Sequence, residues 1–343
     1  MTFSTAVSTL AIAATVAVGA ASASFAEGEL NLYSSRHYDT DERLYTDFEE
    51  LTGIKINRIE GKGDALIERM VSEGVNSPAD VLLTVDNTRL ARAKAAGILQ
   101  SIDSAILEER IPANLQDSDN QWFAFSERAR IFFYDKNDVS EPPQTYVELA
   151  DPKYKGLVCH RSSSNVYSLT LLSAVIEHIG EEAARNWAQG VVDNFAREPQ
   201  GGDMDQLRGL VSGECDISVA NTYYFGRAIR KDVDGLDKAD LENIGWVFPD
   251  QGGNGAHINT SGGGVAAHAP NRENAIKFLE YLASDSAQEY LANGNDEYPV
   301  VDGVPLGAST ATMGDFEADD VDLTAVAENV GMAAQIFNEV GWK

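Results

Sequence analysis

The sequence predicts a two-lobed α/β protein. Three observations favour this fold class: strand-like and helix-like segments alternate over the first hundred residues, the alternation begins again near residue 156, and extended segments lie between the two series. Alternating strands and helices are typical of sheets with parallel strands. Chain length agrees, because removing an export signal of 26 residues from 343 leaves about 317, enough for two domains.

The first 26 residues have the features of a secretory signal. A polar start is followed by an apolar run over residues 6–20 and then by small residues. We expect cleavage near Ala26, with Ala23 as the alternative. The apolar run is too short and too rich in Ala and Thr to span about 30 Å of hydrocarbon comfortably. The sequence therefore predicts an exported protein whose mature chain does not insert into the membrane.

The charge balance excludes some partners. The chain has 54 acidic and 26 basic residues, for a formal net charge of −28. Such a charge repels nucleic acid and anionic membrane surfaces, so we expect no nucleic-acid partner. It does not by itself identify a cation site, because a solvated acidic surface explains it equally well.

The N-terminal half alternates regularly. A buried strand is expected at 29–35, followed by a helix at 39–53 with Asp39 or Thr40 as N-cap and Gly53 at its end. The next predicted elements are a strand at 54–59, a helix at 64–73, a strand at 78–85 and a helix at 90–97. Because sheets of this class bind ligands at the carboxyl ends of their strands, the loops after the strands are candidate site segments.

The chain then passes into a second lobe. Residues 122–134 are expected to form two extended segments that lead there, and the glycine-rich stretch 245–264 is expected to return. The second series consists of a strand at 156–159, helices at 167–179 and 181–191 and a strand at 215–220, with a further amphipathic helix at 271–283. We expect the N-lobe to contain 27–126 and about 254–300, and the C-lobe to contain 127–253 and about 301–343.

Tyrosines follow the predicted strands in three separate regions. His37 and Tyr38 follow the first strand, Tyr167 follows the Ser-rich loop 161–166, and Tyr223 and Tyr224 follow the strand at 215–220. Ferric iron prefers hard, anionic oxygen ligands, and phenolates are such ligands. A phenol titrates near pH 10, so a bound cation must replace its proton at neutral pH. From spacing alone there are two alternatives: packing residues with their hydroxyls in water, and an aromatic surface for sugars or organic cations.

Two cysteines, Cys159 and Cys215, are the only ones in the chain. Export places them in an oxidising compartment, where a pair is typically bridged. We therefore expect a disulfide. Metal binding by the two thiols is the alternative, but no CxxC spacing or clustered histidine accompanies them.

Five segments carry a family resemblance. They are SSRHYDTD (34–41), SPADVLLTVD (77–86), CHRSSSNVY (159–167), ANTYYFGR (220–227) and HINTSGGGV (257–265). They resemble segments of the bacterial periplasmic ferric-iron-binding proteins of iron ABC importers, above all the cyanobacterial FutA-type branch. The similarity covers essentially the whole mature chain. It implies a type II periplasmic-binding-protein fold, in which two lobes with mixed, mostly parallel sheets are joined by crossing hinge strands.

The resemblance also implies a ligand set. Tyr38, Tyr167, Tyr223 and Tyr224 match the iron ligands of the family, and His37 matches a position that is a ligand in some members and idle in others. Four phenolates and one ferric ion leave a charge of −1. Arg227 and Arg36 are the expected cations around the site that offset phenolate charge or bind an anion. The disulfide of the family matches Cys159 and Cys215 and would brace two ligand-bearing segments.

The function implied is that of a monomeric substrate-binding protein without enzymatic activity. It would bind Fe(III) as its transported ligand in the interlobe cleft and deliver it to an inner-membrane ABC permease with its ATPase, with Fe(II) left open. The first alternative is a protein of the same fold that binds a small organic or anionic solute. The second is a secreted two-domain enzyme, although the chain shows no GxSxG, HExxH or paired catalytic carboxylates.

Overall fold

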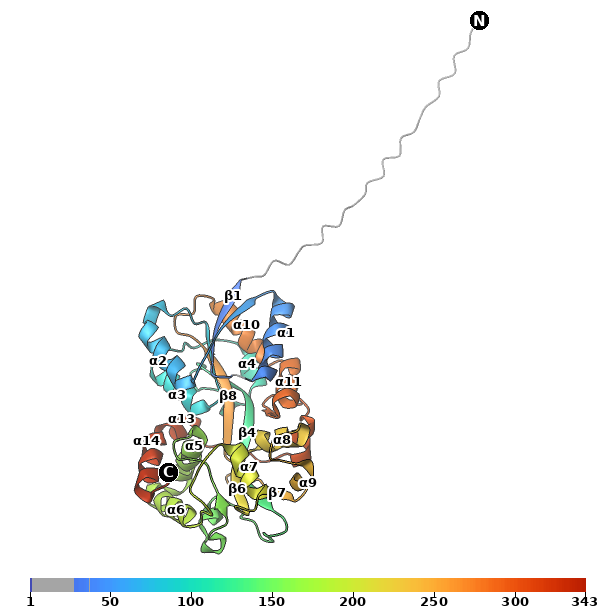
Figure 1. The fold of residues 1–343 in the computed structure, drawn as a ribbon. Helices are drawn as coiled ribbons and strands as arrows, with labels where there is room; N and C mark the ends of the chain where they lie inside the picture. Colours follow the sequence, from blue (N-terminus) through green and yellow to red (C-terminus); the bar gives the residue numbers. More distant parts are fainter. Residues whose placement is uncertain (2–27, 37) are drawn as a thin grey trace.

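The computed structural model describes Met1, residues 28–36 and residues 38–343. Residues 28–36 and 38–343 form two lobes stacked along one axis (Figure 1). In the N-lobe, strands β1 (Glu29–Ser34), β2 (Lys55–Glu60) and β3 (Val81–Thr84) alternate with helices, as expected. The helices of this lobe are α1 (Glu42–Thr52), α2 (Gly63–Glu73), α3 (Asn87–Ala95), α4 (Ala105–Arg110), α10 (Arg272–Leu282) and α11 (Asp285–Asn295).

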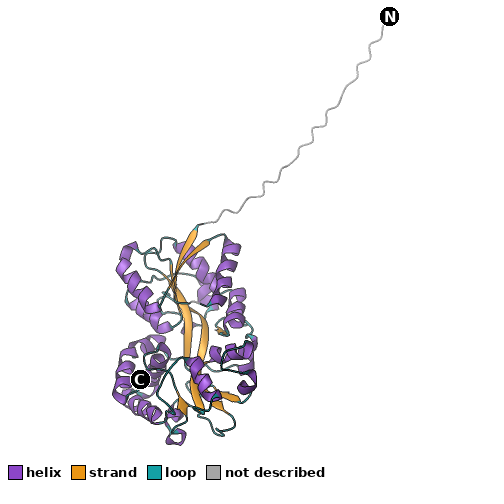
Figure 2. Ribbon diagram, viewed as in Figure 1, coloured by secondary structure: helices purple, strands orange, loops and turns teal. Residues whose placement is uncertain are grey.

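Two long strands connect the lobes (Figure 2). Strand β4 (Phe123–Asp135) and strand β8 (Ile258–Val265) pair antiparallel in the middle of the molecule. Two extended segments were predicted over 122–134, but the structure has one continuous strand of 13 residues. Its N-terminal part pairs with β8 and its C-terminal part with C-lobe strands, so the same strand belongs to both lobes.

The C-lobe holds strands β5 (Val158–Cys159), β6 (Ile217–Asn221) and β7 (Ile244–Val247). Its helices are α5 (Val166–Ile179), α6 (Glu181–Asp193), α7 (Asp203–Val211), α8 (Thr222–Arg230), α9 (Lys238–Leu241), α12 (Ala308–Met313) and α14 (Val330–Val340). Helix α13 (Leu323–Glu328) lies beside both α3 and α5, and the short strand β9 (Tyr298–Pro299) pairs with β4. Helices α11 to α14 follow residue 283, where none was predicted.

Within the described residues, the strands form one sheet with the order β2-β1-β3-β8-β4-β6-β5, and β7 and β9 lie off this path and pair with β4. Pairs within the strand–helix series are parallel, namely β1 with β2, β1 with β3, and β5 with β6. Every pair that involves β4 or β8 is antiparallel. The sheet is thus mixed but less parallel than expected, because the two crossing strands supply most of the antiparallel pairing.

Separate apolar cores stabilise the lobes. Leu30, Phe48 and Phe278 belong to the N-lobe core, and Phe132 and Trp187 belong to a C-lobe core. The C-terminal segment contributes to both, since Leu323 of α13 packs into an N-lobe cluster and Ile336 and Phe337 of α14 pack into a C-lobe core. The third crossing between the lobes lies between α11, whose Leu291 packs into the N-lobe core, and α12, whose Met313 packs into a C-lobe core.

The expected N-cap of the first helix differs from the observed one. A short 3₁₀ turn occupies Asp39–Asp41, and α1 begins after Asp41, which makes no side-chain capping hydrogen bond. The Asp41 carboxylate instead accepts hydrogen bonds from Arg36 Nε at 3.0 Å and Nη2 at 2.8 Å. A buried ion pair has replaced the local capping interaction.

The expected export signal and its cleavage position near Ala26 lie outside the described residues. Within the described part of the chain, no helix is long and apolar enough to cross a membrane.

Candidate metal centre

The four predicted tyrosines lie where strands or loops of the two lobes meet the central cleft. Tyr38 follows β1 of the N-lobe, Tyr167 lies in the first turn of α5, and Tyr223 and Tyr224 lie in the first turn of α8. Electrostatic interactions connect Tyr167 with each of the other three phenols. The rings of Tyr223 and Tyr224 are in contact, with centroids 4.0 Å apart. The structure therefore gathers four phenols from three distant segments.

The three C-lobe tyrosines lie at the N-termini of two helices, α5 and α8. The side chain of Asn165 caps α5 by accepting a hydrogen bond from Tyr167 N at 2.9 Å. Asn221 holds the N-cap position of α8, two residues before Tyr223. The backbone N–H groups of a helix N-terminus carry partial positive charge, so all three tyrosines lie beside such a charge.

Burial opposes ionisation of these phenols. It raises the pKa of Tyr38, and the neighbouring Tyr167 and Glu297 raise it further. Burial and the other phenols likewise raise the pKa of Tyr223, and burial with the charge of Asp203 raises the pKa of Tyr224. Without a bound cation these three groups are neutral at physiological pH. A metal ion would have to displace their protons.

Both predicted arginines contact the phenol group. The Cζ atom of Arg227 lies 5.7 Å from the ring centroid of Tyr38 and 5.4 Å from that of Tyr223. Arg36 lies 5.3 Å from the Tyr38 ring, but its guanidinium is already engaged by Asp41, Glu297 and Ser261. Arg227 forms no ion pair with another described side chain, so it is the freer of the two cations.

Sequence reasoning missed three further arginines around the tyrosines. Arg128 and Arg130 are buried on β4 and Arg161 follows β5, with Cζ distances of 5.9 Å from Arg128 to the Tyr223 ring and of 6.0 Å and 5.4 Å from Arg130 and Arg161 to the Tyr167 ring. Among the described residues, the buried Nε atoms of all three lack a hydrogen-bond partner. Side chains alternate between the two faces of a strand, so Arg128 and Arg130 lie on the same face of β4. This alternation is the sequence signal that could have identified them as a pair.

Asp203 accepts hydrogen bonds from two of these arginines and was not predicted from the sequence. Its carboxylate accepts hydrogen bonds from Arg130 Nη1 at 3.0 Å, Arg161 Nη1 at 2.9 Å and Asn221 N at 2.9 Å. Although burial opposes ionisation, these partners hold the pKa of Asp203 below its usual value. Asp203 thus joins the start of α8 to two cations that face Tyr167.

The donor set is phenolic. The described residues contain no cluster of three or more His, Cys, Asp or Glu side chains that could hold a metal ion. His37, which the sequence analysis left open as a fifth ligand, lies outside the described residues. Among the described residues, the neighbouring carboxylates of Asp203 and Glu297 are already held by arginines, so the tyrosines are the candidate oxygen donors for a metal.

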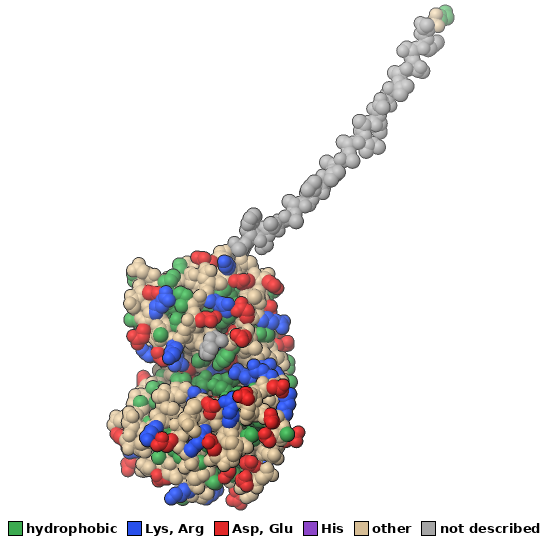
Figure 3. Space-filling view, in the orientation of Figure 1, with side chains coloured by type: hydrophobic (Ala, Val, Ile, Leu, Met, Phe, Trp, Pro, Cys, Tyr) green, Lys and Arg blue, Asp and Glu red, His purple; other side chains and the backbone are tan. Residues whose placement is uncertain are grey.

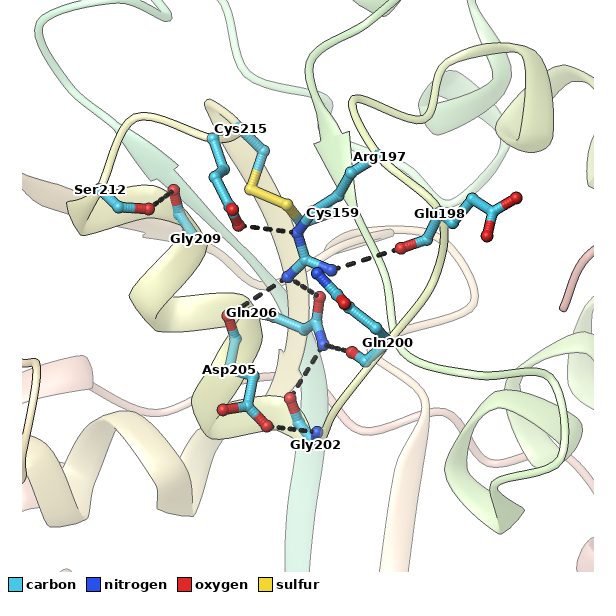
Figure 4. The surroundings of a disulfide bond; sticks show 11 residues. Cys159, Arg197, Glu198, Gln200, Gly202, Asp205, Gln206, Gly209, Ser212 and Cys215 are labelled. Atoms are coloured by element: carbon cyan, nitrogen blue, oxygen red, sulfur yellow. Dashed lines mark hydrogen bonds and ion pairs between the residues drawn. A yellow bond between two sulfur atoms is a disulfide. The ribbon is translucent and has the colours of Figure 1, made fainter.

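The expected disulfide between Cys159 and Cys215 is present, with the two Cα atoms 5.7 Å apart. Figure 4 shows it packed against helix α7, whose Gly209 leaves space for the sulfur atoms. A Cβ atom at Gly209 would lie 3.0 Å from Cys215 Sγ and 3.1 Å from Cys159 Sγ. The bond links the end of β5, which leads to Tyr167, to the start of β6, which leads to Tyr223 and Tyr224.

A cavity of about 210 Å³ opens beside Tyr38 at the junction of the lobes. Arg227, Arg230 and Lys231 line its C-lobe side. Figure 3 shows the groove between the lobes with Lys and Arg side chains gathered at one end. The mouth of the site is therefore locally cationic in a protein that is acidic overall.

Comparison with known proteins agrees with this architecture. Residues 76–313 match the model of a family described as bacterial extracellular solute-binding protein. Iron uptake protein A1 of Synechocystis sp. is 52% identical over 316 residues, which cover 92% of this chain and 88% of the relative.

Solved structures support the same grouping. A Trichodesmium FutA structure in complex with iron and citrate ligands superposes with a TM-score of 0.88 at 49% identity, covering 92% of this chain and all of the other. Apo FutA2 from Synechocystis superposes with a TM-score of 0.85 at 44% identity, covering 92% and 99%. These matches confirm the predicted two-lobed binding-protein fold. The chain belongs to the bacterial extracellular solute-binding protein family, in the branch that contains the FutA-type and ferric-binding proteins.

Proposed function

We propose that this protein is the periplasmic substrate-binding protein of an iron ABC importer and binds Fe(III) in the interlobe cleft. The observation that carries the proposal is that four tyrosines from three segments and both lobes converge, with arginines around them. They are Tyr38, Tyr167, Tyr223 and Tyr224. Relatives of high identity are named iron uptake proteins, and a similar structure contains iron.

The chemistry of the cleft supports ferric iron as cargo. Four phenolates and Fe(III) together carry −1, and the surrounding arginines offset this charge and part of the cost of ionising buried phenols. A divalent ion with the same four phenolates would leave −2. For this reason we assign Fe(III) as the main ligand, and Fe(II) would require one phenol to stay protonated or His37 to take part.

Iron would bring the lobes together. Tyr38 belongs to the N-lobe and the other three tyrosines to the C-lobe, so a metal bound by all four bridges the cleft. The closed form would be the one that an inner-membrane permease recognises before its ATPase drives transport. We propose further that the protein acts as a monomer and that its export signal is cleaved near Ala26.

Absorption spectroscopy tests the proposal. Metal-free protein titrated with ferric citrate should develop a visible phenolate-to-iron charge-transfer band with a stoichiometry of one iron per chain. Tyr224→Phe should weaken the band and the affinity. Tyr154→Phe is the matched control, because the Tyr154 hydroxyl donates to Glu141 O in the C-lobe and takes no part in the site. A mixture whose spectrum is only the sum of protein and ferric citrate would refute iron binding and favour an organic or anionic solute.

A further inference from the structure

Asn259 is a buried polar residue at the centre of the hinge. It lies on β8 directly opposite Arg128 of β4, where the two crossing strands pair. Every polar group of its side-chain amide is used. Nδ2 donates to Thr170 Oγ1 at 3.0 Å and to Asp86 Oδ2 at 3.3 Å, and Oδ1 accepts from Asn221 Nδ2 at 3.2 Å.

The three partners come from three different helices. Thr170 lies one turn after Tyr167 on α5, Asn221 is the N-cap residue of α8, and Asp86 is the N-cap residue of α3 in the N-lobe. One amide therefore touches both helices that carry C-lobe tyrosines and also one helix of the opposite lobe.

Asn221 bonds to Asn259 instead of capping its own helix. An asparagine at an N-cap position ordinarily accepts a hydrogen bond from the first turn of its own helix. The Asn221 side chain makes no such bond here. Its Nδ2 donates to Asn259 and its Oδ1 accepts from Arg130 Nη1 at 3.0 Å. Hydrogen bonds to β4 and β8 at the hinge thus fix the start of α8, in place of a capping hydrogen bond within the helix.

Such a network defines geometry more than it adds stability. A hydrogen bond contributes a modest net free energy of folding, whereas a fully satisfied buried network allows only one arrangement of its members. Because the members lie next to metal-facing turns, the arrangement that they define is the spacing between those turns.

We propose that Asn259 is a positioning residue for iron binding. It holds the first turns of α5 and α8 at the separation in which Tyr167, Tyr223 and Tyr224 face one centre, and it ties that arrangement to the N-lobe through Asp86. The inference rests on the proposed function, since it names a residue that shapes the same site without contacting the metal.

The decisive variant is Asn259→Asp. Its carboxylate keeps the acceptor for Asn221 but loses both donors and faces the carboxylate of Asp86 across the lobe boundary. Iron affinity, measured by competition with nitrilotriacetate, should fall by about 10- to 100-fold, as for other residues that orient metal ligands. The charge-transfer band per bound iron should shift or weaken, which a general loss of stability would not cause.

A compensating change provides rescue. In Asn259→Asp/Asp86→Asn the amide and the carboxylate exchange places, so a donor again faces an acceptor, and residue 86 still accepts from Thr88 N. The double variant should recover most of the lost affinity and the parent band. Asn194→Asp is the matched control, because Asn194 is buried and donates to the carbonyls of Leu149 and Asp151 far from the site. It should lower the melting temperature without changing the affinity or the band.

An Asn259→Asp protein with the affinity and band of the parent would overturn the inference, as would a double variant no better than the single one. If Asn259→Asp does not fold, Thr170→Val removes the hydrogen bond between Asn259 and α5 at nearly constant volume, together with the weaker contacts of the Thr170 hydroxyl to His257 Nε2 and Tyr167 O. It should weaken binding by about threefold, which corresponds to about 0.65 kcal/mol and lies within the range for one hydrogen bond. Parent affinity in that variant would also overturn the inference. Failure of the unmodified protein to bind iron would instead refute the proposed function.

Discussion

The guanidinium carbon of Arg227, on α8 of the C-lobe, lies 5.7 Å from the ring centroid of Tyr38, on the N-lobe. The same atom lies 5.4 Å from the ring of Tyr223. One cation thus faces two predicted ligands that belong to different lobes. This places positive charge where two phenolates would develop on iron binding.

Arg227→Gln should therefore weaken Fe(III) binding by about tenfold, because the charge that offsets the phenolates is lost. Arg227→Lys should retain part of the affinity, since it keeps the charge but not the planar group. Competition titrations with nitrilotriacetate measure both. Arg185→Gln is the control, because Arg185 is a surface residue paired with Glu181 and Glu339. Equal affinities for all four proteins would contradict a role for Arg227.

Arg128→Met should also reduce affinity, by about 10- to 100-fold. Arg128 is buried, donates to Ser261 Oγ at 2.8 Å and lowers the pKa of Tyr38 and Tyr223 from the values that burial alone would produce. Without it those phenols should hold their protons more tightly. Because Arg128 forms no ion pair with another described side chain, its removal leaves no buried carboxylate unpaired, and thermal melts of the iron-free variant should show a folded protein. Unchanged affinity in that folded variant would argue against the assigned role.

Iron affinity should fall as pH falls. Burial raises the pKa of Tyr38, Tyr223 and Tyr224, so all three are protonated at neutral pH and each must release a proton when it binds iron. Below the raised pKa values, each phenolate ligand should cost roughly tenfold in apparent affinity per unit decrease in pH.

Calorimetric titrations in buffers of different ionisation enthalpy count these protons. Tyr224→Phe should release one proton fewer than the unmodified protein, whereas Tyr154→Phe should release the same number. Binding without proton release would mean that the tyrosines are not the ligands.

Removal of the disulfide should destabilise the protein. Cys159 and Cys215 are separated by 56 residues, and closing a loop of that size stabilises the folded state by about 4 kcal/mol in the chain-entropy description. Denaturant titration of Cys159→Ser/Cys215→Ser should show a lower free energy of unfolding. A reducing agent should lower the stability of the unmodified protein and leave the double variant unchanged. Equal stability of the two proteins would show that the bond does not constrain the unfolded chain.

Much of the fold could be predicted from local signals. The strand–helix alternation placed β1, β2, β3 and their helices to within a few residues, because hydrophobic periodicity and glycine at helix ends are local properties. The continuity of β4 was not predicted. Its pairing changes from β8 to β6 and β7 within one strand, and no local pattern reports a change of partner.

The sequence by itself determined which residue types could act: four tyrosines at the ends of strands, a cysteine pair in an exported chain, and segments shared with a known family. Only the tertiary structure decided how these residues are surrounded. Four separate segments supply these surroundings and converge through the crossing strands, namely β4 with Arg128 and Arg130, and the segments that carry Arg161, Asp203 and Asn259. Their roles depend on distances across two lobes, and such distances arise only when β4 and β8 bring the lobes together.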